Sequence, residues 1–142
     1  MPIVGFDFDK IIVERKSKTL GNINVKHNLG IKEVEEEKIP LSKLEQVLRF
    51  NFEYTVDYEP KVGNLQLNGH ILYLDEPKKI KELMTDWKKN KKIPTEIMEQ
   101  LLNTILFKCN IKALSLSQDV ALPPHIPLPR LEPQKSGKDY IG

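Results

Sequence analysis

A chain of 142 residues fits one domain and can bury a core without disulfides or a structural metal. Its formal net charge of +2 is too small for whole-protein electrostatics to select a partner, and its single cysteine, Cys109, excludes an internal disulfide and favours a reducing compartment. No signal peptide is visible, and no apolar run approaches the roughly 20 residues of a membrane helix. We therefore expect a cytoplasmic protein that does not interact with a membrane.

The first predicted element is a β-strand over residues 3–14. Its alternation places Phe6 and Phe8 on one apolar face. The apolar pattern changes phase after Asp9. One extra residue there, a β-bulge, would return Ile11 to the same face.

Three more strands are expected. Residues 23–31 alternate through the second, and the glutamate-rich residues 33–40 then lead into a loop, followed by a short helical turn at residues 41–44. In the third, apolar side chains occupy every second position over residues 48–58, which is typical of an antiparallel strand with one buried face. The fourth covers residues 65–73, and the connection between the third and fourth strands is so short that they must form a hairpin.

Two helices follow the strands. The first begins after Asp75, the expected N-cap, with Pro77 in its first turn. Its apolar stripe is narrow and consists of Ile80, Leu83, Met84 and Trp87. The second opens near residues 94–96 and carries a core-facing stripe as far as Cys109. Beyond that residue it either continues or breaks near Asn110.

A proline-rich stretch ends the ordered part of the chain. Residues 122–133 hold five of the ten prolines, which favour an extended backbone near polyproline II. Its apolar residues, among them Leu122, Ile126 and Leu128, are unusual in a free linker, so we expect it to lie against the body. The prediction is one α+β domain over residues 1–133, followed by a flexible C-terminal tail over residues 134–142.

No sequence pattern supports catalysis, a cofactor or a metal. There is no glycine-rich phosphate loop, no Gly-x-Ser-x-Gly turn and no pair of histidines at metal-binding spacing. Asp7 and Asp9 are spaced like the metal-binding carboxylates of some hydrolases, but a second strand follows them where those folds have a helix. Cys109 is more simply a small apolar residue of a helix stripe than a reactive thiol. We interpret the chain as a non-enzymatic protein.

The lysine-rich first helix suggests one possible function. Its cluster consists of Lys78, Lys79, Lys81, Lys88, Lys89, Lys91 and Lys92. Phosphate contacts from such a cluster would give salt-sensitive binding to RNA or to the ribosome. The simpler interpretation is the solvated outer face of an amphipathic helix.

The apolar strand faces suggest a different function, the binding of polypeptide. Two helices can bury only part of the apolar face of four long strands. The remaining apolar surface must then be buried in an oligomer or bind a partner. Candidate contacts for an extended polypeptide come from the strands and the proline-rich stretch: Phe6, Phe8, Phe50, Phe52, Tyr54, Leu122, Ile126, Leu128 and Leu131. The simpler interpretation of the aromatic residues in the third strand is that they form the core.

Taken together, these elements resemble the bacterial protein-export chaperone SecB and its archaeal relatives. Residues 6–14 resemble the family's opening strand, which runs through a lysine into an apolar stretch ending in glutamate. The pair Leu106-Phe107 resembles the start of the family's run toward a proline-rich segment, here residues 122–129. No clear terminal helix or acidic tail follows that segment.

This resemblance implies a tetramer built as a dimer of dimers, with apolar grooves that hold unfolded chains without nucleotide. An extended client exposes backbone hydrogen-bonding groups and apolar side chains, which a sheet edge and an aromatic groove can satisfy. Binding the unfolded state slows its aggregation by mass action. We therefore favour a chaperone-like holdase. The alternatives are an RNA- or ribosome-associated protein and a structural subunit of a larger complex.

Overall fold

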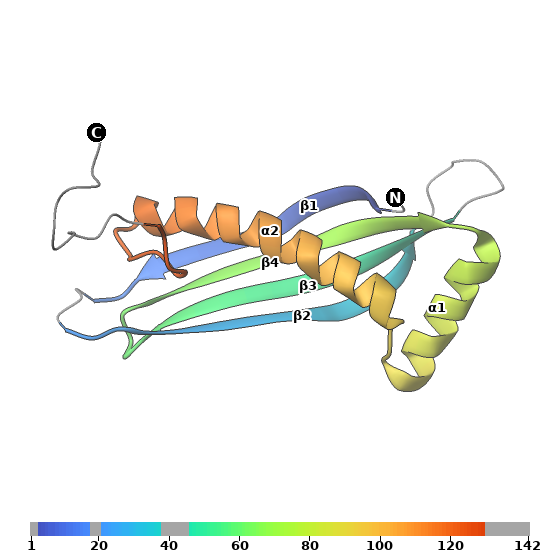
Figure 1. The fold of residues 1–142 in the computed structure, drawn as a ribbon, viewed down its shortest axis with the longest axis horizontal. Helices are drawn as coiled ribbons and strands as arrows, with labels where there is room; N and C mark the ends of the chain where they lie inside the picture. The colour runs from blue at the N-terminus through green and yellow to red at the C-terminus, as the bar shows by residue number, and fades with distance from the viewer. Residues whose placement is uncertain (1–2, 18–20, 38–45, 130–142) are drawn as a thin grey trace, which may run out of the picture.

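Four strands are followed by two helices in the computed structural model, which describes residues 3–17, 21–37 and 46–129 (Figure 1). The elements are β1 (Ile3–Arg15), β2 (Asn24–Glu37), β3 (Gln46–Glu59), β4 (Gly63–Asp75), α1 (Pro77–Asn90) and α2 (Thr95–Asp119). The predicted α+β order is therefore confirmed. The helical turn predicted at 41–44, the candidate Leu131 and the predicted tail at 134–142 lie outside the described residues.

All neighbouring strands in the single sheet are antiparallel, and their order is β1-β4-β3-β2. The predicted β3–β4 hairpin is present, and its turn follows Glu59. β1 and β2 are consecutive in the chain but lie at opposite edges of the sheet, each with one neighbour. Both edges therefore present backbone groups that are not paired within this sheet.

The predicted bulge in β1 is present, as a register shift between Phe8 and Lys10. Phe8 lies opposite Gly69, and after the shift Ile11 lies opposite Leu67. Gly69 and Leu67 are both on the buried face of β4, so the bulge keeps the apolar residues of β1 on one side.

The predicted end of β2 was wrong, because the strand continues through Glu37 where a loop was expected. A register shift between Ile31 and Glu33 restores the alternation, and Val34 is buried opposite Phe50. Glu33, Glu35 and Glu36 are exposed. An edge strand tolerates such a charged run because it leaves these side chains in water.

One expectation about the helices also needs correction. The N-cap of α1 is Glu76 and not Asp75, and no side chain caps the helix; the Asp75 carboxylate accepts a hydrogen bond from the Glu76 backbone N–H. Of the two alternatives for α2, the structure has the continuous helix, whose core-facing spacing continues to Ala113. The predicted stripe of α1 is confirmed, with Met84 half-buried and the other three residues buried.

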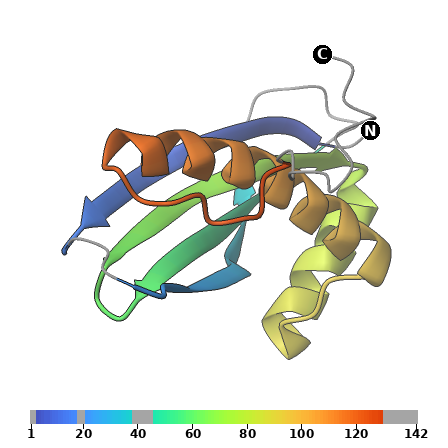
Figure 2. The same ribbon diagram turned by 60° about the vertical axis from the view of Figure 1, so that its left-hand side comes forward.

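The core lies between one face of the sheet and the helices. Figure 1 shows α2 running along the sheet and α1 at one end, and Figure 2 shows the segment after α2 turning back beside that helix. The opposite sheet face is polar along most of β4, where it carries Asn64, Gln66, Asn68 and His70, and becomes apolar at the end of that strand, with Leu72 and Leu74. Within the described residues, neither helix is long and apolar enough to span a membrane.

Candidate polypeptide-binding surface

The structure divides the predicted apolar contacts into two clusters. Phe6 and Phe8 of β1 gather around Phe52 of β3, with ring centres 5.2 and 6.4 Å from it, toward the β1 edge of the sheet. Tyr54 instead contacts the segment after α2, where its ring centre lies 6.2 Å from that of His125. Because His125 also packs against His27 of β2, this second cluster lies toward the β2 edge.

A shallow groove with aromatic and aliphatic side chains in its lining lies between β1 and α2. Its volume is about 560 Å³, and it is lined by Phe6, Asp7, Phe8, Phe107, Lys108, Ile111, Lys112 and Ser115. We call this the β1–α2 groove. Phe107 is 69% exposed and Ile111 is 56% exposed, whereas Phe6 and Phe8 are half-buried at its base.

The aromatic base of the groove depends on a glycine. Gly69 of β4 pairs with Phe8 on one side and with Phe52 on the other. A Cβ at position 69 would overlap the Phe52 ring and the Asp7 carbonyl oxygen, so its absence makes room for the ring. Phe6 stacks on Phe52 with an interplanar angle of 27°, which fixes the orientation of the half-exposed ring.

Positive charge lies along the α2 side of this groove. The Lys108 Nζ atom is 5.2 Å from the centre of the Phe6 ring, within the range of a cation–π interaction. Lys112 follows four residues later on the same face of the helix. The groove therefore combines aromatic surface, a basic rim and a strand edge that has no neighbour within this sheet.

The remaining aromatic candidates are inside the protein. Phe50, Phe52 and Tyr54 are at most 1% exposed and belong to the core. The Tyr54 hydroxyl donates a hydrogen bond of 2.8 Å to Asn110 Oδ1 of α2, and burial raises the pKa of this tyrosine. In this conformation these three residues support the groove and the helix from below.

Residues 121–129 pack against the helix side of the sheet, as expected for the proline-rich stretch. The Leu122 backbone N–H donates to the Ser117 carbonyl oxygen at 2.8 Å, and the Tyr58 hydroxyl donates to the Pro123 carbonyl oxygen at 2.8 Å. Leu122 is buried, Ile126 is half-buried and Leu128 is 48% exposed. Of the predicted contacts in this segment, Ile126 and Leu128 are therefore the accessible ones.

His125 is the most enclosed polar residue of this segment, at 4% exposure. Its Nε2 atom lies 2.9 Å from Asn110 Oδ1, which accepts hydrogen bonds and cannot donate them, so Nε2 carries the proton. Its Nδ1 atom is buried and has no hydrogen-bond partner among the residues that the structure describes. Burial and the neighbouring His27 lower the pKa of His125 to about 4, so the ring is neutral at pH 7.

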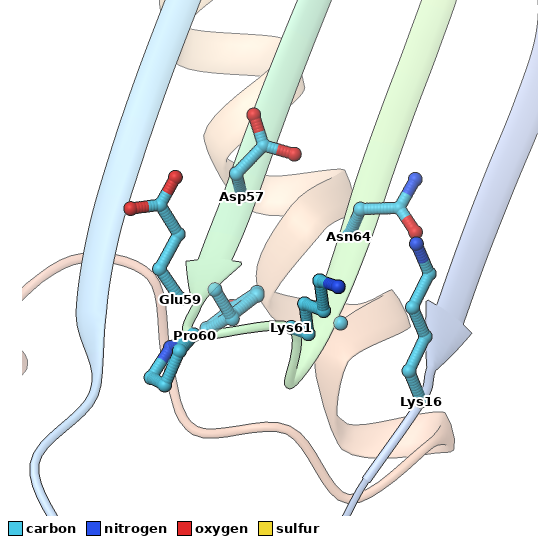
Figure 3. A pocket seen from close by; sticks show the side chains of 8 residues that line it. Lys16, Asp57, Glu59, Pro60, Lys61 and Asn64 are labelled. Atoms are coloured by element: carbon cyan, nitrogen blue, oxygen red, sulfur yellow. The ribbon is translucent and has the colours of Figure 1, made fainter.

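A second depression lies at the β3–β4 turn on the polar face of the sheet (Figure 3). It has a volume of about 440 Å³, and Figure 3 shows Lys16, Asp57, Lys61 and Asn64 around it. These charged and amide side chains do not offer the apolar surface that an unfolded polypeptide requires. The β1–α2 groove is therefore the better candidate.

The carboxylates considered for metal chemistry are engaged otherwise. Asp9 Oδ2 lies 2.8 Å from His70 Nδ1 and 3.3 Å from Arg49 Nη2. Asp7 Oδ2 lies 3.7 Å from His70 Nε2. Across the described ranges, no three His, Cys, Asp or Glu side chains are arranged to hold a metal ion. Cys109 is fully buried, and burial raises the pKa of its thiol to about 12.

Sequence reasoning missed the five groove residues on α2: Phe107, Lys108, Ile111, Lys112 and Ser115. Phe107 and Ile111 are four residues apart, and both fall outside the stripe of buried residues that includes Ile105 and Cys109. Large apolar residues off the core stripe of a helix would have indicated this surface.

Comparison with known proteins supports the fold. No protein-family model and no curated protein matches the chain. Among solved structures, it is similar to the SecB-like chaperone Rv1957 of Mycobacterium tuberculosis, solved in complex with a ChAD peptide from the Rv1956 HigA1 antitoxin. The two chains are 14% identical, with a TM-score of 0.50 over 93% of this chain and 91% of the other. This protein therefore has a SecB-like fold, with a four-stranded antiparallel sheet followed by two helices.

Proposed function

We propose that this protein is a cytoplasmic, non-enzymatic holdase that binds extended or unfolded polypeptide in the β1–α2 groove. One observation carries the proposal: an aromatic groove lies directly beside a sheet edge that has no neighbour in the described chain. The similarity in fold to a chaperone solved with a bound peptide supports it.

The two halves of the groove match the two exposed parts of an unfolded chain. The edge of β1 offers backbone donors and acceptors over a strand of 13 residues, which an added strand can pair with irrespective of its sequence. Phe107 and Ile111 on α2 offer apolar surface to the client's side chains. Backbone pairing and general apolar contact together favour extended segments with little sequence specificity.

Homo-oligomerisation is a further part of the proposal. Within the described ranges the sheet has two edges without a neighbouring strand, and large apolar side chains are exposed on β1 and α2. Such surfaces are commonly buried between copies of a chain. We expect a tetramer, as the family resemblance implies, and light scattering would measure the assembly.

Two neighbouring residues of α2 provide a matched test. Phe107 lines the groove, whereas Leu106 is 40% exposed and is not part of its lining. The Phe107→Ser variant should bind a fluorescent unfolded peptide at least about tenfold more weakly, because a contact of this size contributes more than 1.4 kcal/mol. It should also fail to suppress aggregation of a denatured model protein. The Leu106→Ser variant should retain both activities.

Other outcomes would contradict the proposal in distinguishable ways. A Phe107→Ser variant that binds peptide like the parent would show that clients do not use the groove. A larger loss of peptide affinity in Leu106→Ser than in Phe107→Ser would show that clients bind to the other flank of α2. If Phe107→Ser only reduces the number of subunits and peptide binding is unchanged, the groove is a subunit interface.

A further inference from the structure

Four of the five lysines of α1 lie on one side of the helix. Residues three or four positions apart share a helix face, so Lys78, Lys81, Lys88 and Lys89 align along one side through Thr85. We call these four residues the lysine stripe. Ile80, Leu83 and Trp87 face the core, and Met84 is half-buried between the core and the stripe.

Two acidic residues of α1, Glu82 and Asp86, lie beside the lysine stripe. They line one depression with Lys78, Lys81 and Thr85, and another with Pro94 and Ile97 at the start of α2. Four lysines against two carboxylates leave this surface with a net positive charge.

No member of the lysine stripe is neutralised by an ion pair. All four side chains are exposed, and among the described residues none lies within 4.0 Å of a carboxylate oxygen. Lys88 and Lys89 lie in the last turn, where their charge also favours the helix dipole. Lys91 and Lys92 extend the positive charge beyond the helix end, although the Lys91 ammonium lies 5.1 Å from the Trp87 ring centre.

We propose that the lysine stripe binds the phosphate backbone of single-stranded nucleic acid. The stripe spans 11 residue steps, or about 17 Å of helix, along which a flexible strand can place successive phosphates. Protein–protein interfaces are poor in lysine and are built around an apolar centre, which this surface lacks. Trp87 is buried and cannot stack on a base, so binding is independent of base sequence.

This site is separate from the β1–α2 groove. In Figure 1, α1 stands at one end of the sheet, and the groove residues belong to the middle and later turns of α2. Nucleic-acid binding and polypeptide binding can therefore be removed independently by substitution.

The experiment measures anisotropy of a fluorescent 20-nucleotide poly(U) RNA from 50 to 200 mM salt. About four phosphate contacts at a slope of about −0.7 each predict an approximately 50-fold loss of affinity over this range. Changing Lys78, Lys81, Lys88 and Lys89 to Gln should weaken binding at 50 mM salt at least tenfold. A matched variant that loses four exposed lysines elsewhere (Lys16, Lys26, Lys32 and Lys61 to Gln) should stay within threefold of the parent.

Three results would overturn the proposal: no binding by the parent at 50 mM salt, equal losses in the two variants, or competition by polyglutamate as effective as that by unlabelled RNA. The last would indicate an acidic polypeptide partner. Single-stranded DNA of the same length should compete comparably, because the phosphates carry the interaction. Both variants should keep the parent's melting curve and its suppression of aggregation, since the replaced side chains are exposed and lie outside the groove.

Discussion

Acid should loosen the attachment of residues 121–129 to the helix side of the sheet, because His125 is held there as a neutral ring. Protonation would place a positive charge in a site that is 4% exposed, beside the His27 ring at a centre-to-centre distance of 5.4 Å. It would also add a proton to Nδ1, for which the described residues provide no acceptor.

The size of this effect follows from the lowered pKa. His125 has a pKa of about 4 in the folded protein and 6.5 at its ordinary value. The folded state therefore binds the proton less well than the unfolded chain does, so stability is complete above pH 6.5 and is lost as the pH falls toward 4. At about 1.4 kcal/mol for each pKa unit, the loss is about 2 kcal/mol at pH 5 and about 3 kcal/mol at pH 4.

Two measurements check this reasoning. An NMR titration should show the His125 ring protonating near pH 4. Urea unfolding at pH 7 and pH 5 should show a fall in the free energy of unfolding that is about 2 kcal/mol larger in the parent than in His125→Phe, which keeps an aromatic ring and cannot titrate. A His125 pKa near 6.5, or an equal fall in both proteins, would refute the argument.

Four substitutions test the fold. Phe52→Asp, which buries a charge at a site that is 1% exposed, should cost several kcal/mol and abolish cooperative thermal unfolding; an unchanged melting temperature would mean that this face is open. Gly69→Ala should cost about 1–3 kcal/mol in urea unfolding, because its Cβ would overlap the Asp7 carbonyl oxygen and the Phe52 ring; an unaltered midpoint would disprove the close approach. Ile105→Ala should cost about 2–5 kcal/mol, whereas Ile111→Ala, at an exposed position, should change stability by less than about 0.5 kcal/mol. Similar values for these two would contradict the assigned helix orientation.

The local spacing of apolar residues was sufficient to predict most of the secondary structure. The strict alternation of β3 and the phase change after Asp9 each have one geometric solution, a half-buried strand and a bulge. The prediction from local pattern failed at residues 33–37, where four glutamates indicated a loop. The edge position of β2 and the pairing of Val34 with Phe50 kept this stretch in the sheet, and neither feature is visible locally.

Local sequence pattern was also insufficient to locate the candidate site. Alternation showed that Phe6, Phe8, Phe50 and Phe52 lie on apolar strand faces, but it could not rank them by accessibility. Leu106 and Phe107 are adjacent in the chain, yet Phe107 alone lines the groove, because successive helix residues point about 100° apart.

The sequence by itself determined the α+β class, the bulge in β1 and the single apolar face of β3, because these depend on residue spacing of two or three to four. Only the tertiary structure decided which aromatic residues can meet a partner. The strand order β1-β4-β3-β2 places β3 inside the sheet, where Phe52 is enclosed, and β1 at an edge, where Phe6 and Phe8 are only half covered. The physical reason is that alternation defines a side of a strand, whereas exposure depends on what packs against that side.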